Sequence, residues 1–316
     1  MDVVALGELL IDFTWNGLSS QGNGLFEANP GGAPCNVLAM LAKLGRSTGF
    51  IGKVGNDFFG TMLAEVVKEQ GICVDGLVYD SEIHTTLAFV HTKEDGDRSF
   101  SFYRNPGADM MLQKDEVDRE LVREAKIFHF GTLSMTNETA EEATRAAVEE
   151  AKRAGAILSF DPNLRPPLWS SMEKAKQKIA YGLSVCDVLK ISDDELFFMA
   201  GTTDIEKGVA VLLEEYRIPF VCATMGRDGS KAFFDGQAVA GKSFLTEETI
   251  ETTGAGDTFC ACMLDYILEN GLKSHNLEKV RKMLEFANAA ASLVTTRRGA
   301  LKVMPTRKEV AAFMQK

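Results

Sequence analysis

Residues 251–259 read Glu251-Thr252-Thr253-Gly254-Ala255-Gly256-Asp257-Thr258-Phe259. Apolar residues follow at positions that share one helical face: Phe259, Ala261, Met263, Leu264, Ile267 and Leu268. The small residues therefore open a helix, predicted over 255–270, whose first backbone N–H groups lack partners within it. Gly254 and Gly256 leave these groups open to an anion, and the helix dipole favours negative charge there.

Asp257 adds a carboxylate to the first turn of this helix. Such a pairing suits phosphoryl transfer, because N–H groups stabilise charge on the moving phosphoryl group while a carboxylate takes the proton of the attacking hydroxyl. The candidate catalytic residues are thus Gly254, Ala255, Gly256 and Asp257. The alternative is an ordinary helix start, in which Asp257 only complements the dipole.

Composition limits the class of protein. The 316 residues are 45% hydrophobic and 25% charged, as in an ordinary soluble globular protein. The net charge of −11 argues against a general nucleic-acid surface, and no apolar run approaches the roughly 18 residues of a membrane span. The N-terminus starts as a strand rather than a signal peptide, so we expect a cytoplasmic protein with reduced, scattered cysteines.

Strands and helices alternate along most of the chain, which predicts an α/β fold. We expect one domain over residues 1–316, a three-layer αβα sandwich with a mostly parallel central sheet. Two strands, 85–92 and 98–104, are joined by a polar turn at 93–97 and form a hairpin that interrupts this alternation. The segments at about 13–29 and 84–105 are therefore predicted to form a small β-sheet lid, through which two copies form a homodimer. Residues 16–30 are expected to be a loop within it.

Polar residues follow several predicted strands. Asp12 is placed at the end of a strand over 3–9, and Arg165 lies just past a strand over 156–161. Ligands of open α/β sheets bind at the carboxyl ends of strands, so Asp12 is a candidate for binding hydroxyls and Arg165 is expected near the ligand crevice. For Asp12 the alternative is an ordinary turn aspartate.

A glycine pair and the hairpin exit add further candidates for binding a small molecule. Gly31 and Gly32 precede a helix predicted over 37–44, and Asn36 offers both a donor and an acceptor. Asn36 could equally be an N-terminal cap. Phe102 and Arg104 lie at the end of the predicted hairpin, where their side chains could close over a ligand.

The second half of the chain carries candidates for nucleotide binding. Residues 224–230 form a glycine-containing loop suited to phosphates, after a strand over 220–224. Residues 236–243 match the P-loop pattern G-x-x-x-x-G-K-S, but their variable positions are strand-like and apolar, so we reject a P-loop. Asn288 lies on a helix with a small-residue face that suits either adenine or close helix packing. Ser192 and Glu195 have the spacing of a capping box, which by itself explains Glu195.

Two separated motifs resemble the ribokinase-like (PfkB) carbohydrate kinases: Pro30-Gly31-Gly32-Ala33-Pro34-Cys35-Asn36 and Thr252-Thr253-Gly254-Ala255-Gly256-Asp257-Thr258-Phe259. Within this family, residues 7–13, 102–106 and 161–165 are most similar to fructokinases. The resemblance implies ATP-dependent phosphorylation of a sugar hydroxyl, the 6-hydroxyl of D-fructose, with Asp257 receiving the proton.

The resemblance also implies roles for individual residues. The sugar would be contacted by Asp12, Gly31, Gly32, Asn36, Phe102, Arg104 and Arg165. ATP would be contacted by Lys190, Thr224, Gly226, Gly229 and Asn288. Glu195 would place Mg²⁺ through water. A K⁺ ion would be held by Glu251, Thr253, Val294, Arg297 and Gly299.

Two positions depart from the family pattern. Glu251 stands where aspartate is usual before the Thr-Thr pair, and its longer side chain leaves the K⁺ dependence open. Ser192 replaces an asparagine found in many members, and its shorter side chain is expected either to weaken or to reroute the metal–water contact. Two alternative functions also remain: a 2-keto-3-deoxygluconate kinase, in which Arg104 and Arg165 pair with the substrate carboxylate, and a catalytically silent sugar-binding protein.

Overall fold

The computed structural model describes residues 1–92, 98–273 and 275–315. Its central sheet has nine strands in the order β13-β12-β11-β10-β9-β8-β1-β4-β5, and neighbours are parallel except for β11–β12 and β12–β13. The strands are β1 (Val3–Leu6), β4 (Thr48–Gly55), β5 (Ile72–Asp80), β8 (Ile127–Gly131), β9 (Ile157–Asp161), β10 (Val188–Ser192), β11 (Phe220–Thr224), β12 (Ser230–Phe234) and β13 (Gln237–Gly241). The predicted mostly parallel sheet is confirmed.

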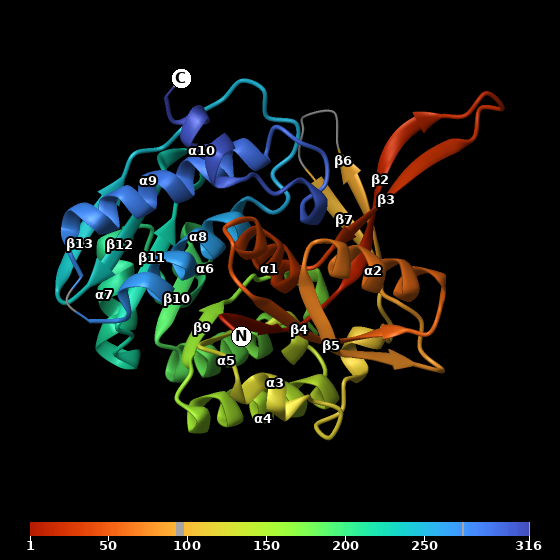
Figure 1. Cartoon of the computed structure of the whole chain (residues 1–316), viewed down its shortest axis with the longest axis horizontal. Coiled ribbons are helices and arrows are strands. Elements are labelled where there is room, and N and C mark those ends of the chain that lie inside the picture. The colour runs from red at the N-terminus through yellow and green to blue at the C-terminus, as the bar shows by residue number, and fades with distance from the viewer. Residues whose placement is uncertain (93–97, 274, 316) are drawn as a thin grey trace.

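Helices cover both faces of this sheet, which makes three layers (Figure 1). The hydrophobic core on one face includes residues of α1 (Ala33–Lys43), α2 (Phe58–Glu69), α8 (Ala255–Asn270), α9 (Leu277–Val294) and α10 (Arg307–Phe313). The core on the other includes residues of α3 (Arg119–Arg123), α4 (Glu138–Ala154), α5 (Met172–Val185), α6 (Asp193–Ala200) and α7 (Ile205–Tyr216). The helix predicted over 255–270 is confirmed as α8.

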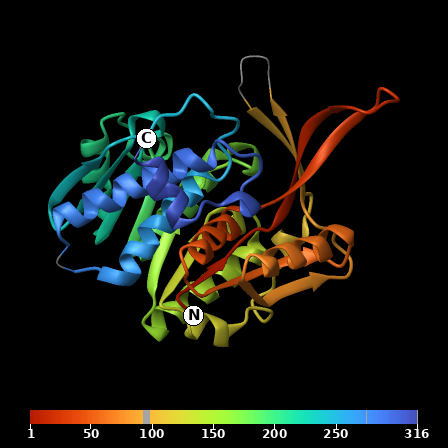
Figure 2. The ribbon, with the colours of Figure 1, turned by 45° about the horizontal axis from the view of Figure 1, so that its top comes forward.

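A second, smaller sheet projects from the body of the molecule (Figure 2). It has the strand order β3-β2-β6-β7 and is built from β2 (Leu10–Leu18), β3 (Gly24–Gly31), β6 (Leu87–Thr92) and β7 (Arg98–Tyr103). The predicted strands on either side of the 93–97 turn are confirmed, while the turn itself lies outside the described residues. The loop expected over 16–30 is wrong, because β2 and β3 pair there as an antiparallel ladder.

The chain leaves the central sheet earlier than expected. The strand predicted over 3–9 ends at Leu6, and β2 begins at Leu10 in the small sheet. Asp12 therefore lies within a small-sheet strand, opposite Asn29, rather than at the end of a central strand. The helix expected over 37–44 begins earlier, at Ala33, because Pro34 is well tolerated in a first helical turn.

The strand order reverses direction beside β1. From β1 the chain adds β4 and β5 on one side and later adds β8 to β11 on the other. Ligands of open α/β sheets bind at such a point, outside the carboxyl ends of the strands. The rejection of the P-loop is consistent with the fold, since residues 237–241 form antiparallel β13. Among the described helices, none has the length and hydropathy to cross a membrane.

Candidate active site

Two cavities meet at the N-terminus of α8. The larger has a volume of about 580 Å³ and the smaller about 360 Å³, and Thr252 and Gly256 line both. The helix begins after Gly254, whose φ of 78° suits glycine, and no described side chain caps it. Ala255 N donates to Thr252 O at 3.3 Å, and the rest of the first turn lies where the two cavities join, as an anion site requires.

The larger cavity lies beside β11, α8 and α9. It is lined by Thr224, Gly226, Arg227, Gly229, Ser243, Phe244, Leu245, Thr246, Glu247, Thr249, Thr252, Ala255, Gly256, Phe259, Asn288, Ala291, Ser292 and Thr295. Of the residues predicted to bind ATP, Thr224, Gly226, Gly229 and Asn288 meet here. Segment 243–249, which contributes much of one wall, was not predicted, because it carries no recognised motif.

The smaller cavity lies between the central sheet and the small sheet. It is lined by Glu8, Leu10, Asp12, Gly32, Ala33, Asn36, Phe102, Leu133, Asn163, Arg165, Lys190, Ser192, Glu195, Thr252, Thr253, Gly254, Gly256 and Asp257. Asp12, Gly32, Asn36, Phe102 and Arg165 were predicted to contact a sugar and are brought together here. Glu8 and Asn163 were missed, although each lies in a motif just past a central strand, where ligands collect.

Asp257 is held by Asn36 from the facing helix. Asn36 Nδ2 donates to Asp257 Oδ2 at 2.8 Å. Burial raises the pKa of Asp257 to about 6, and the hydrogen bond from Asn36 opposes part of that rise. Asn36 Oδ1 is buried and has no hydrogen-bond partner among the described residues. Because the amide nitrogen faces the carboxylate, the oxygen is the polar atom of Asn36 that remains unpaired in the described part of the chain.

Asp12 faces the same cavity from the small sheet. A Cβ on Gly31 would lie 2.5 Å from Asp12 Oδ2, so the glycine leaves room for this carboxylate. Gly31 itself does not line the cavity. Burial raises the pKa of Asp12 to about 7, while the charge of Arg165 opposes the rise. The ionised form can accept hydroxyl hydrogens on both oxygens.

Lys190 lies beneath the start of α8. Its Nζ is 3.0 Å from Asp161 Oδ2, and both side chains are almost fully buried. A Cβ on Gly256 would lie 3.1 Å from the same Nζ, so the ammonium sits directly behind the open N–H groups. Burial lowers the pKa of Lys190, but the charges of Asp161 and Glu195 outweigh that effect and raise it overall. The start of α8 therefore has a buried ammonium, paired with Asp161, close to the positive end of the helix dipole.

Glu195 has both of its carboxylate oxygens engaged. One accepts from Leu164 N at 2.8 Å and the other from Ser192 N at 2.9 Å, which confirms the capping box. Each carboxylate oxygen has capacity for a second hydrogen bond, and Glu195 lines the smaller cavity, so it could still accept from a metal-bound water. The described residues contain no cluster of three His, Cys, Asp or Glu side chains suited to a metal ion. A divalent ion here would depend on phosphate and water ligands, as Mg²⁺ commonly does.

Arg104 is not where the motif placed it. Its guanidinium donates to Asp109, to Thr136 Oγ1 at 2.8 Å and to Leu133 O at 3.0 Å, and it does not line the smaller cavity. Asp109 also accepts from Thr86, just before β6. One buried carboxylate thus ties both ends of the β6–β7 hairpin to the body. The expected contact between Arg104 and a sugar is replaced by this structural role.

Asn288 is also occupied by protein partners. Its Oδ1 accepts from Ser230 Oγ at 2.9 Å, and its Nδ2 donates to Lys242 O at 2.9 Å. The side chain therefore joins α9 to β12 and β13. Asn288 lines the larger cavity, but its amide already makes hydrogen bonds to the protein on both sides and does not have a free donor and acceptor pair for adenine.

Glu251 lies against the loop that follows α9. Its Oε1 accepts from Gly299 N at 2.9 Å, and its backbone N donates to Thr295 O at 3.1 Å. Arg297 turns away, toward Val303 O and Glu309. Val294 ends α9 and its carbonyl accepts from Arg297 N, while Thr253 lines the smaller cavity. The structure therefore brings Glu251 to the expected loop and joins the two directly.

Comparison with known proteins places this geometry in a family. Residues 1–307 match the pfkB family carbohydrate kinase. The chain is 40% identical over 316 residues to probable fructokinase-2 of Arabidopsis thaliana, covering 99% of this chain and 95% of that protein.

Two solved structures share the whole fold. Fructokinase of Xylella fastidiosa with bound ATP has a TM-score of 0.89 and 33% identity, covering 99% of this chain and 98% of that one. Fructokinase of Vibrio cholerae O395 with fructose, ADP and calcium ion has a TM-score of 0.89 and 30% identity, covering 99% of both. This protein belongs to the pfkB family of carbohydrate kinases.

Proposed function

We propose that this protein transfers the terminal phosphate of ATP to the 6-hydroxyl of D-fructose. The observation that carries the proposal is the position of Asp257, beside an open helix N-terminus that joins a nucleotide-sized cavity to a sugar-sized one. Similarity to fructokinases that hold ATP, or fructose and ADP, supports both substrates.

The residues divide the chemistry between them. Asp257 takes the proton of the attacking hydroxyl as the oxygen approaches the phosphorus. The N–H groups around Gly254, Ala255 and Gly256, together with Lys190, stabilise the charge on the phosphoryl oxygens. Asp12 and Asn36 orient the sugar from two sides. Mg²⁺ bound to the phosphates would neutralise their charge, with Glu195 holding one of its waters.

The charge of the smaller cavity favours a neutral sugar over a keto acid. Four carboxyl groups line it (Glu8, Asp12, Glu195 and Asp257), against two cations, Arg165 and Lys190. Lys190 lies at the start of α8, where the phosphates are proposed to bind, and Arg104 is engaged elsewhere. A substrate carboxylate would therefore meet mainly like charge.

The proposed function is tested by ADP release with D-fructose, 2-keto-3-deoxygluconate, D-glucose and D-ribose. Coupling through phosphoglucose isomerase detects the 6-phosphate and not the 1-phosphate of fructose. We expect fructose to give the highest kcat/KM and a signal in this coupled assay. A higher kcat/KM with the keto acid would identify 2-keto-3-deoxygluconate as the substrate instead of fructose. No ADP release with any sugar would favour a catalytically silent binding protein.

The fall in activity at low pH should depend on the protonation of two carboxyl groups. Asp257 and Asp12, with pKa values raised by burial to about 6 and about 7, must both be ionised, one as base and one as acceptor. We therefore expect kcat/KM for the sugar to fall as pH drops below about 7 and to fall more steeply below about 6. In the Asp12→Asn variant, only the fall in kcat/KM below about pH 6 should remain. A profile that stays flat to pH 5 would contradict this assignment.

K⁺ should activate the enzyme only modestly. We propose a K⁺ site between Glu251 and the 294–299 loop, but the hydrogen bond from Gly299 already links these segments without an ion. We therefore expect K⁺ to raise turnover by less than about tenfold over tetramethylammonium, equivalent to ~1.4 kcal/mol. Strict dependence on K⁺ would show that the direct bond does not replace the ion.

We also propose that the small sheet acts as a lid and as the contact between two copies of the chain. Side chains alternate between the two faces of a sheet, and the face of the small sheet opposite Asp12 carries aromatic rings. Trp15, Phe26 and Tyr103 are 53%, 44% and 66% exposed there, although Trp15 packs against Phe26. Both outer strands, β3 and β7, lack a neighbour on one side among the described strands. An apolar face of this kind is typical of an interface.

The dimer is tested by replacing one exposed ring. Trp15→Glu should weaken dimerisation by at least about 30-fold, the equivalent of a hot-spot loss of ~2 kcal/mol. Analytical ultracentrifugation measures the change. Phe197→Glu, at an exposed ring on α6, is the matched control and should dimerise normally. A wild-type protein that remains monomeric at micromolar concentration would remove the proposal.

A further inference from the structure

The first turn of α1 lacks a cap from its own sequence. Its N-cap residue is Gly32, which has no side chain, and Pro34 in the first turn has no N–H to satisfy. The backbone N–H of Ala33, the first helical residue, therefore needs an acceptor from elsewhere. A helix end buried beside a ligand cavity without such an acceptor would be destabilised.

Glu8 supplies that acceptor from another part of the chain. Glu8 Oε1 accepts from Ala33 N at 2.9 Å, and the residue is only 4% exposed. The two segments also touch through their backbones, because a Cβ on Gly32 would lie 2.3 Å from the Glu8 carbonyl oxygen. Glu8 follows β1, so this bond connects the central sheet directly to the start of α1.

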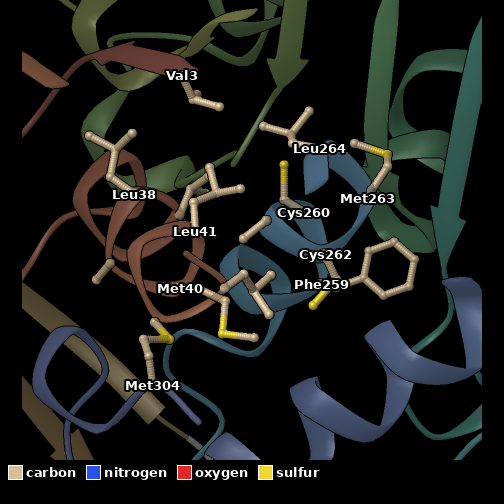
Figure 3. Packing of buried hydrophobic residues seen from close by; sticks show 14 of the residues in the cluster. Val3, Leu38, Met40, Leu41, Phe259, Cys260, Cys262, Met263, Leu264 and Met304 are labelled. Atoms are coloured by element: carbon tan, nitrogen blue, oxygen red, sulfur yellow. The ribbon is translucent and has the colours of Figure 1, made fainter. Parts of the chain in front are cut away.

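The same turn of α1 carries the residue that holds the candidate base. Asn36 N donates to Gly32 O at 3.0 Å, which makes Asn36 part of the turn that Ala33 begins. Asn36 Nδ2 then reaches Asp257 Oδ2 at 2.8 Å on α8. Below this point Leu38, Met40 and Leu41 of α1 pack near Phe259, Cys260 and Leu264 of α8 (Figure 3). The core fixes the bodies of both helices, while the first turn of α1 depends on its terminal bonds.

We propose that Glu8 is a positioning residue, whose bond to Ala33 fixes the first turn of α1 and thereby holds Asn36 against Asp257. This inference rests on the proposed function, in which Asp257 is the base. Glu8 acts through Asn36 and does not exchange a proton with the sugar.

The proposed role of Glu8 requires a side-chain oxygen within hydrogen-bond distance of Ala33 N, and it does not require a negative charge. Burial raises the pKa of Glu8 to about 7, and an uncharged carboxyl oxygen still accepts the Ala33 hydrogen bond. Glutamine has the same length and the same acceptor oxygen. Aspartate keeps the carboxyl group but is one methylene shorter. Glu8→Gln and Glu8→Asp therefore separate reach from charge.

The test measures kcat for ADP release in wild type, Glu8→Gln, Glu8→Asp, Glu8→Ala, Asn36→Ala and the Glu8→Ala/Asn36→Ala double variant. We expect Glu8→Ala and Glu8→Asp to lose about tenfold to 100-fold, because small misplacements at a reacting centre are costly. Glu8→Gln should stay within about threefold of wild type. In the Asn36→Ala background, Glu8→Ala should cost less than about twofold more, since coupled residues are not additive.

Several results would overturn the proposal. Losses that multiply in the double variant would mean that Glu8 acts independently of Asn36. Glu8→Gln as impaired as Glu8→Ala, or Glu8→Asp as active as wild type, would show that the carboxyl group matters rather than the reach to Ala33. Thermal unfolding identifies any variant that fails to fold, and the Gln–Asp comparison then decides alone. A wild-type protein inactive with every sugar rejects the proposed function instead.

Discussion

Asp257→Asn should lower kcat by about 10²–10⁴-fold while sugar affinity changes little, because asparagine preserves the shape but cannot take a proton. The effect should be large since Asp257 stands beside the open start of α8 and is held there by Asn36. Water in the cavity is a far weaker base at neutral pH. Turnover by coupled ADP release and sugar binding by calorimetry measure the two quantities separately.

A matched control keeps the same chemical change away from the site. Asp193→Asn alters an exposed carboxylate in the first turn of α6 and should leave kcat unchanged. Near-normal turnover in Asp257→Asn would remove Asp257 from the role of base. A loss of sugar binding as large as the loss of turnover would make it a binding residue instead.

Lys190→Met should impair both stability and turnover. Removing the ammonium leaves the buried Asp161 with only the hydrogen bond from Asn163 N among the described residues, and breaking one side of a buried pair costs about 3–5 kcal/mol. The loss also takes away a positive charge behind the anion site, where removing one stabilising group typically costs about 10²–10³ in kcat. Chemical unfolding and steady-state kinetics measure the two effects.

A double variant distinguishes these two effects of Lys190. Lys190→Met/Asp161→Leu replaces the buried pair with apolar side chains, so we expect much of the lost stability to return. Turnover should remain low, because the charge behind Gly256 is still missing. Recovery of turnover together with stability would show that Lys190 serves the fold alone.

Local patterns were sufficient where one element carries its own signal. The run from Gly254 to Asp257 predicted a helix start with a carboxylate in its first turn, and the structure shows a helix that begins there without a cap from any described side chain. The apolar, strand-like positions before Lys242 correctly excluded a P-loop. The spacing of Ser192 and Glu195 predicted a capping box that is present. Each signal depends on contacts within a few residues, which short-range periodicity records.

The errors arose where partners come from distant parts of the chain. The polar composition of residues 16–30 suggested a loop, yet backbone pairing between β2 and β3 imposes strands there. Arg104 looked like a ligand contact, but Asp109, Thr136 and Leu133 occupy its guanidinium. Glu8 was missed because its partner, Ala33, is 25 residues away. Competition among long-range partners is not visible in a local pattern.

By itself, then, the sequence determined the alternating α/β order, the glycine-containing helix start and the carboxylate that is the candidate base, because these follow from periodicity and from the chemistry of adjacent residues. Tertiary structure decided which side chains share a cavity, that Asn36 meets Asp257 across two helices, and that burial raises the pKa values of Asp12 and Asp257. The physical reason is that desolvation and partner choice depend on every element packed around a group, and packing exists only in the folded chain.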